Sequence, residues 1–151
     1  MPTTEERYNQ VVSFASSISD DMMWIHANWE ILKHSIDDNI EQRMVGTYAG
    51  NAWKTLRRTI LNEIHMGLSR ILIDQDSRAA SLPRLRLLLD DKEILTYVES
   101  KYTQGEGAFK LRLRQLQSRL RKLNAATNDT NSDLKKLIRH RNHYMAHRAA
   151  K

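Results

Sequence analysis

Residues 139–147 bring together side chains that transfer protons and side chains that bind phosphate. They read R-H-R-N-H-Y-M-A-H, with three histidines and two arginines in nine residues. An imidazole accepts or donates a proton near neutral pH, and a guanidinium binds phosphate oxygens through paired hydrogen bonds. Together they suit RNA cleavage without a metal: histidine takes the proton of a ribose 2′-hydroxyl, and arginine stabilises charge on the phosphate.

The candidate catalytic residues are Arg141, His147 and Asn142. Arg141 shares a helical side with the apolar residues Leu134, Ile138 and Met145, so it is expected to point towards packed surface. His147 lies about 120° away from it on a straight helix. Either a bulged helix end or a site shared by two subunits near a two-fold axis would bring the two together. Asn142 would orient the histidine or bind phosphate.

The histidines of this stretch also allow a metal-binding interpretation. His140, His143 and His147 follow one another at spacings of three and four residues, which places them on one helical side. The motif H-E-x-x-H and cysteine ligands are both absent from the sequence. We therefore predict no metal and no other cofactor, and keep a three-histidine site as the third hypothesis.

A second group of candidate residues contacts RNA rather than reacting with it. Within residues 110–122, cations recur at Lys110, Arg112, Arg114, Arg119, Arg121 and Lys122. We expect Lys110, Arg114 and Arg121 to bind RNA phosphates, together with Arg139 and His143 from the last helix. The net charge of +6 agrees with an acidic partner such as RNA. The alternative is a solvated basic face that binds nothing.

Helices must hold these residues in place. Five glycines and two prolines among 151 residues favour helix, and apolar residues recur at three- and four-residue steps. We predict an all-α fold in a single domain, 1–151: an antiparallel bundle of four main helices plus a short helical pair. The main helices are expected at 3–35 (unless Asp20 and Asp21 break the first), 44–73, 108–126 and from about 132 onwards. The short pair is expected at 81–89 and 91–104.

Two further expectations concern the regions between and inside these helices. The polar residues 37–41 read as a connection, and Trp24 and Trp29 read as core residues. The sequence contains no apolar run long enough to span a membrane, and its first seven residues do not resemble a signal peptide. The lack of cysteine fits a reducing compartment. We therefore expect a cytoplasmic protein without a membrane partner.

Residues 141–147, R-N-H-Y-M-A-H, resemble the R-x(4–6)-H motif of HEPN-domain proteins, in which a polar residue commonly follows the arginine. Upstream, a long helix ending at 71–73, then Asp74, then Ser81-Leu82 and Leu85, is similar to the abortive-infection branch of that superfamily. This resemblance implies a helical domain that dimerises through its motif helices. It also implies that Arg141 and His147 form the catalytic pair of a metal-independent ribonuclease, with Asn142 as companion.

The same resemblance implies a toxin or phage-defence protein that acts on RNA and leaves a 2′,3′-cyclic phosphate. A cognate antitoxin, such as a nucleotidyltransferase, would be a further partner. Some toxin members carry a tyrosine two residues after the histidine, which such an antitoxin modifies, whereas this chain has Ala149. The chain ends four residues after His147, which would leave little helix to brace the site. The competing hypothesis is a non-catalytic helical module that binds RNA, a nucleotide or a protein.

Overall fold

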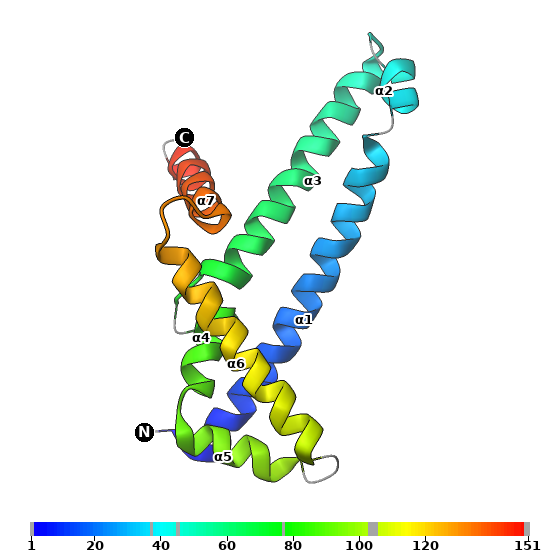
Figure 1. Ribbon diagram of the computed structural model, residues 1–151. Helices are drawn as coiled ribbons and strands as arrows, with labels where there is room; N and C mark the ends of the chain where they lie inside the picture. Colours follow the sequence, from blue (N-terminus) through cyan, green and yellow to red (C-terminus); the bar gives the residue numbers. More distant parts are fainter. Residues whose placement is uncertain (1, 37, 45, 77, 103–105, 150–151) are drawn as a thin grey trace.

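The computed structural model describes residues 2–36, 38–44, 46–76, 78–102 and 106–149, and over these it contains helices and no strands (Figure 1). The all-α fold is thereby confirmed. The helices are α1 (Thr4–Ser35), α2 (Asp38–Met44), α3 (Tyr48–Ile73), α4 (Leu82–Leu89), α5 (Lys92–Lys101), α6 (Glu106–Asn128) and α7 (Asp133–Ala149). Within this part of the chain, no helix has the length and hydropathy to cross a membrane.

α1 begins at a capping box and runs without a break. The Thr3 hydroxyl accepts a hydrogen bond from the Glu6 amide at 3.2 Å, and the Glu6 carboxylate accepts one from the Thr3 amide at 2.7 Å. Asp20 and Asp21 do not interrupt the helix. Asp21 instead accepts two hydrogen bonds from Arg70 of α3, at 2.5 and 3.0 Å. The acidic pair therefore lies on a helix surface, and one member ties α1 to α3.

The turn between α1 and α3 differs from its prediction. We expected a polar connection at 37–41. Residues 38–44 instead form the short polar helix α2. Gly46 has φ of 81°, a conformation that favours glycine, and it reverses the chain after α2. Thr47 then caps α3 by accepting a hydrogen bond from the Gly50 amide at 3.1 Å. α3 therefore begins at Tyr48 rather than at residue 44.

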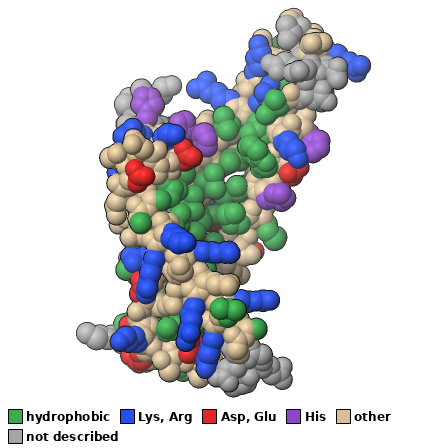
Figure 2. Space-filling model, viewed as in Figure 1, with side chains coloured by type: hydrophobic (Ala, Val, Ile, Leu, Met, Phe, Trp, Pro, Cys, Tyr) green, Lys and Arg blue, Asp and Glu red, His purple; other side chains and the backbone are tan. Residues whose placement is uncertain are grey.

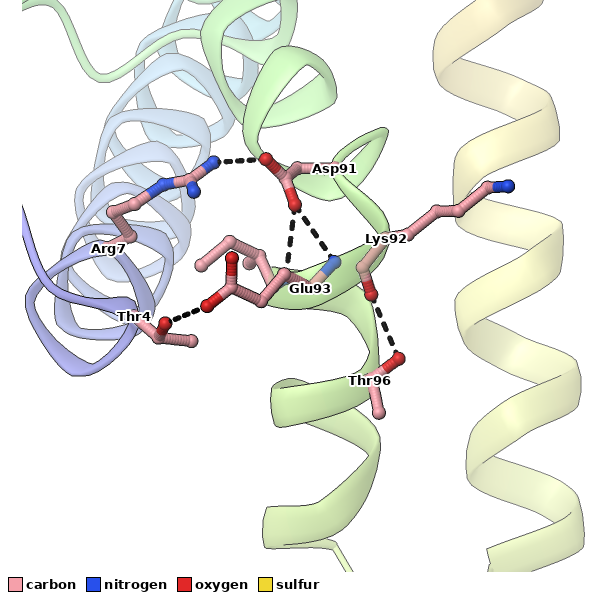
Figure 3. Close-up of polar contacts among 7 residues, drawn as sticks. Thr4, Arg7, Asp91, Lys92, Glu93 and Thr96 are labelled. Carbon is pink, nitrogen blue, oxygen red and sulfur yellow. Dashed lines mark hydrogen bonds and ion pairs between the residues drawn. The ribbon is translucent and has the colours of Figure 1, made fainter.

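The N-terminal end of α1 is fixed to α5 by polar contacts (Figure 3). Arg7 donates to the carboxylate of Asp91 at 2.6 Å, and the Thr4 hydroxyl donates to Glu93. Asp91 also caps α5, since its side chain accepts hydrogen bonds from the amides of Glu93 and Ile94. The pKa of Asp91 is lowered, mainly by the bond from Arg7 and then by the bond from the Ile94 amide.

The core lies where α4, α5 and α6 pack against the half of the α1–α3 pair that contains the N-terminal end of α1 (Figure 1). Ser81 caps α4 at the start of the segment 81–89 that we expected to be helical, and Leu85, Leu88 and Leu89 are buried. The buried apolar residues form one cluster that spans α1 and α3 to α6. This part of the molecule is the helical core, and α7 packs at one side of it.

The prediction that Trp24 and Trp29 are core residues is wrong. Their side chains are 60% and 50% exposed, respectively. The reason is that the distal half of the α1–α3 hairpin extends beyond α4, α5 and α6 (Figure 1). There only the residues that face the other helix of the pair, such as Ile25 and Leu32, are buried. Hydrophobic periodicity identified the helix correctly, but it did not show which sides have a neighbour.

Candidate functional site

α7 carries the predicted catalytic motif and packs on α3 and α6 (Figure 1). Ser132 caps it by accepting a hydrogen bond from the Lys135 amide at 3.1 Å, at the predicted start of the last helix. The helix is α-helical without interruption from Asp133 to Ala149. The bulged helix end is therefore not observed, so the backbone does not bring Arg141 and His147 to the same side. The side chain of His147 lies outside the described residues.

Arg141 points towards α3, as its place on the apolar stripe predicted. It is half-buried and lies beside a hollow of about 380 Å³, whereas its neighbour Asn142 is exposed. The Nε and Nη2 groups of Arg141 each donate to Asn142 Oδ1 at 3.3 Å. The asparagine oxygen therefore holds the guanidinium from one side and leaves its other N–H groups available to an anion. These two predicted catalytic residues do lie together.

The hollow beside Arg141 has walls from both helices. It is lined by Met66, Ser69, Arg70, Asp74, Arg141 and Asn142. Arg70 is held by its two bonds to Asp21 of α1, so its guanidinium is already paired. Ser69 is 1% exposed, and its hydroxyl has no hydrogen-bond partner among the described residues. Sequence reasoning missed these α3 residues, although a serine next to an apolar stripe is a signal for one of them.

His140 and His65 form a second contact between α7 and α3. Their rings meet edge to face, with centroids 4.5 Å apart. Burial, followed by the positive charge that His140 can carry, lowers the pKa of His65. The two histidines also line a second, shallow hollow, whose other lining residues are Asp133, Lys136 and Leu137. His65 is thus a packed histidine, and His140 faces a histidine on another helix.

The three-histidine metal site has no support from the described side chains. Within the part of the chain that the structure describes, no group of three or more His, Cys, Asp or Glu could hold a metal. His140 contacts α3, and His143 is exposed. The third predicted ligand, His147, has a side chain outside the described residues.

The predicted RNA-binding cations occupy two helices. Arg139 and His143 are exposed on α7, Arg114 and Arg121 are exposed on α6, and Lys110 is half-buried on α6. Arg121 forms an ion pair with Asp90 at 3.0 Å, so part of its role is to link α6 to the end of α4. Figure 2 shows Lys and Arg side chains gathered over α6. The basic character of this face agrees with the charge pattern seen in the sequence.

A family model described as AbiU2, of the HEPN type, matches residues 8–151, which include most of α1, all of α2 to α7 and the whole of the α7 motif. The chain belongs to the AbiU2 family of HEPN domains. No curated protein and no solved structure matches it. The resemblance to the abortive-infection branch of the HEPN superfamily is therefore confirmed.

Proposed function

We propose that this AbiU2-family domain is a metal-independent endoribonuclease of toxin–antitoxin or phage-defence type that acts as a homodimer. The observation that supports this most is the placement of Arg141. The motif arginine faces a hollow at the α3–α7 contact, with the Asn142 oxygen against its guanidinium. An arginine in such a position is suited to binding a phosphate that enters the hollow.

The proposed reaction is attack of a ribose 2′-oxygen on the adjacent phosphorus. The imidazole of one His147 takes the proton from the 2′-hydroxyl, and a bond forms between the 2′-oxygen and phosphorus. The bond from phosphorus to the 5′-oxygen breaks, and that oxygen receives the proton that the same His147 imidazole took from the 2′-hydroxyl, so each site needs one histidine. The products are a 2′,3′-cyclic phosphate and a free 5′-hydroxyl. Arg141 stabilises the charge that builds on the non-bridging oxygens.

An exposed apolar groove next to α7 supports the homodimer. On α3, Arg58, Leu61 and His65 share one side of the helix at three- and four-residue spacing. His65 on this side contacts α7, whereas the preceding turns form a groove of about 480 Å³ against α1. Its lining residues are Trp29, Leu32, Ile36, Lys54, Arg57, Arg58 and Leu61.

Figure 2 shows hydrophobic side chains gathered over α3, and between α3 and α1, beside α7. Trp29 and Ile36 in this groove are each 50% exposed. A contiguous exposed apolar surface of this kind is typical of a protein–protein interface. A second copy placed there would bring its own α7 near the two-fold axis, where an arginine from one subunit and a histidine from the other meet.

The experiment is an RNA cleavage assay with purified protein and a mixed-sequence RNA. We expect products with 2′,3′-cyclic phosphate ends, unchanged by a chelator, and a loss of about 100-fold or more in rate for Arg141→Ala and for His147→Ala. Arg43→Ala, at an exposed arginine on α2, is the matched control and should cleave normally. Cleavage that persists in both motif variants would contradict the proposal.

The exposed arginines of α6 favour one alternative, a non-catalytic RNA-binding module. Arg114 lies on that basic face, away from the lining of the Arg141 hollow. RNA binding that survives both motif substitutions, in a wild-type protein that never cleaves RNA, would support this alternative. Binding lost on Arg114→Ala would then locate the RNA on α6.

A further inference from the structure

The Ser69 hydroxyl lacks the hydrogen bond to a preceding backbone carbonyl that six other helical hydroxyls of this chain make. In an α-helix, a serine or threonine hydroxyl commonly donates to the carbonyl three or four residues earlier. The hydroxyls that do so here are those of Ser35, Thr55, Thr59, Thr96, Ser100 and Thr127. Ser69 is more deeply buried than any of these, at 1% exposed, yet its hydroxyl has no partner among the described residues.

An unpaired buried hydroxyl costs free energy, and an acceptor that entered the hollow and bonded to it would remove that cost. Ser69 forms part of the wall of the hollow beside Arg141. A serine hydroxyl moves easily between staggered positions, so at most one change of χ1 turns it towards whatever fills the hollow. The hollow of about 380 Å³ has room for a phosphate group with its attached sugar atoms.

The other polar groups in the hollow define the chemistry of this missing partner. Arg70 gives its Nε and Nη2 groups to Asp21, so the donors that line the space are Arg141, Asn142, Ser69 and the remaining Nη1 group of Arg70. A guanidinium, an amide and a hydroxyl are together suited to an oxyanion with several acceptor oxygens. The carboxylate of Asp74 has the opposite effect, because its negative charge repels an anion that lies close to it.

We propose that Ser69 is a substrate-binding residue whose hydroxyl donates to a non-bridging phosphate oxygen held by Arg141 and Asn142. The identification of this phosphate with the scissile group of RNA rests on the proposed ribonuclease function, whereas phosphate binding by the hollow does not. Asp74 keeps the anion on the Arg141 side of the hollow. Ser69 thus adds a contribution from α3 to a site whose predicted residues all come from α7.

The experiment measures binding of inorganic phosphate to the full chain by NMR, from shifts of the backbone amides of Ser69, Arg141 and Asn142. Ser69→Ala should weaken binding by about tenfold, the effect of losing one hydrogen bond to a charged oxygen. Ser35→Ala removes another buried serine hydroxyl, one that already donates to the Leu32 carbonyl at 2.6 Å, and should leave binding unchanged.

Asp74→Asn gives a test with the opposite sign. Asparagine keeps the side-chain oxygen that accepts from the Asp76 amide at 3.0 Å, but it removes the negative charge. Phosphate should therefore bind more tightly to this variant, by severalfold at low salt. A thermal melt of each variant shows that the fold is kept.

The outcomes separate this inference from the ribonuclease proposal. Weaker phosphate binding by Ser69→Ala, with no RNA cleavage by the wild type, supports the phosphate site and overturns only the nuclease. RNA cleavage by the wild type, with phosphate binding and KM unchanged in Ser69→Ala, overturns the role of Ser69 and leaves the nuclease standing. Absence of phosphate shifts in the wild type, or weaker binding by Asp74→Asn, also overturns the proposed site.

Discussion

The ring of His140 on α7 packs edge to face against the ring of His65 on α3, with centroids 4.5 Å apart. This contact joins the helix that carries the predicted catalytic motif to the long hairpin. The groups that line the hollow around it are Asp133, Lys136 and Leu137. Because burial and the neighbouring His140 both lower the pKa of His65, the neutral imidazole is the form that fits here.

The first prediction is that acid weakens this contact. The unfolded chain binds a proton at His65 near pH 6.5, while the folded chain resists it, so the free energy of unfolding should fall as pH drops below about 6.5. The loss continues until the pH passes the lowered pKa of the folded state. Urea unfolding of the wild type and His65→Gln at several pH values measures this.

The variant should show a smaller decrease between pH 7 and about pH 5. His26→Gln replaces an exposed histidine of α1 and serves as the control. It should keep the wild-type dependence on pH. If the two variants and the wild type lose stability in parallel, His65 does not couple the α3–α7 contact to pH.

The second prediction concerns two buried serines with opposite hydrogen-bonding states. Ser69→Ala removes an unpaired hydroxyl, so it should raise the free energy of unfolding by about 1 kcal/mol. Ser35→Ala removes a paired hydroxyl and should lower it by about 1 kcal/mol. Chemical denaturation of the two variants provides the comparison. Destabilisation by Ser69→Ala would mean that its hydroxyl already has a partner in the free protein.

The third prediction concerns the link between α1 and α5 shown in Figure 3. Asp91 both pairs with Arg7 and caps α5, so Asp91→Ala should lower Tm more than Arg7→Ala, which removes the pair alone. The pKa of Asp91 is lowered in the fold, so its contribution is present above about pH 4 and is lost as pH falls towards the lowered value. Thermal melts at pH 7 and pH 3 should therefore show the two variants approaching the wild type at the lower pH.

The fourth prediction uses two exposed tryptophans of α1. Trp29 lines the apolar groove beside α3, whereas Trp24 does not line it, although it is exposed to a similar degree. Trp29→Glu should weaken self-association of the protein, because it places a charge in the proposed interface. Trp24→Glu is the matched control and should leave self-association unchanged. Analytical ultracentrifugation of both variants measures this, and equal effects would place the interface elsewhere.

Much of the fold follows from local sequence signals. Thr3, Ser81 and Ser132 each begin a helix as predicted, because each offers a side-chain oxygen to an amide that the helix leaves unpaired. The orientation of the Arg141 side chain towards α3 followed from its position on the same helical side as Leu134 and Ile138. Such features depend on residues close together in the chain, and sequence reasoning captures them well.

What could not be predicted depends on contacts between distant segments. The exposure of Trp24 and Trp29 depends on how far α4, α5 and α6 extend along the hairpin, which periodicity does not contain. The polar composition of residues 38–44 concealed the short α2. Likewise, Ser69 lies more than 70 residues before Arg141 in the chain, and only the packing of α7 on α3 places both beside one hollow.

The central claim is that an arginine from one subunit and a histidine from the other form one site. The most direct measurement is RNA cleavage by an equal mixture of Arg141→Ala and His147→Ala proteins, refolded together so that mixed dimers form. In a shared site, a mixed dimer contains one intact Arg141–His147 pair, so activity should return to about a quarter of the wild-type value. If the mixed dimer forms and remains as inactive as either variant alone, each site belongs to a single chain and the claim is contradicted.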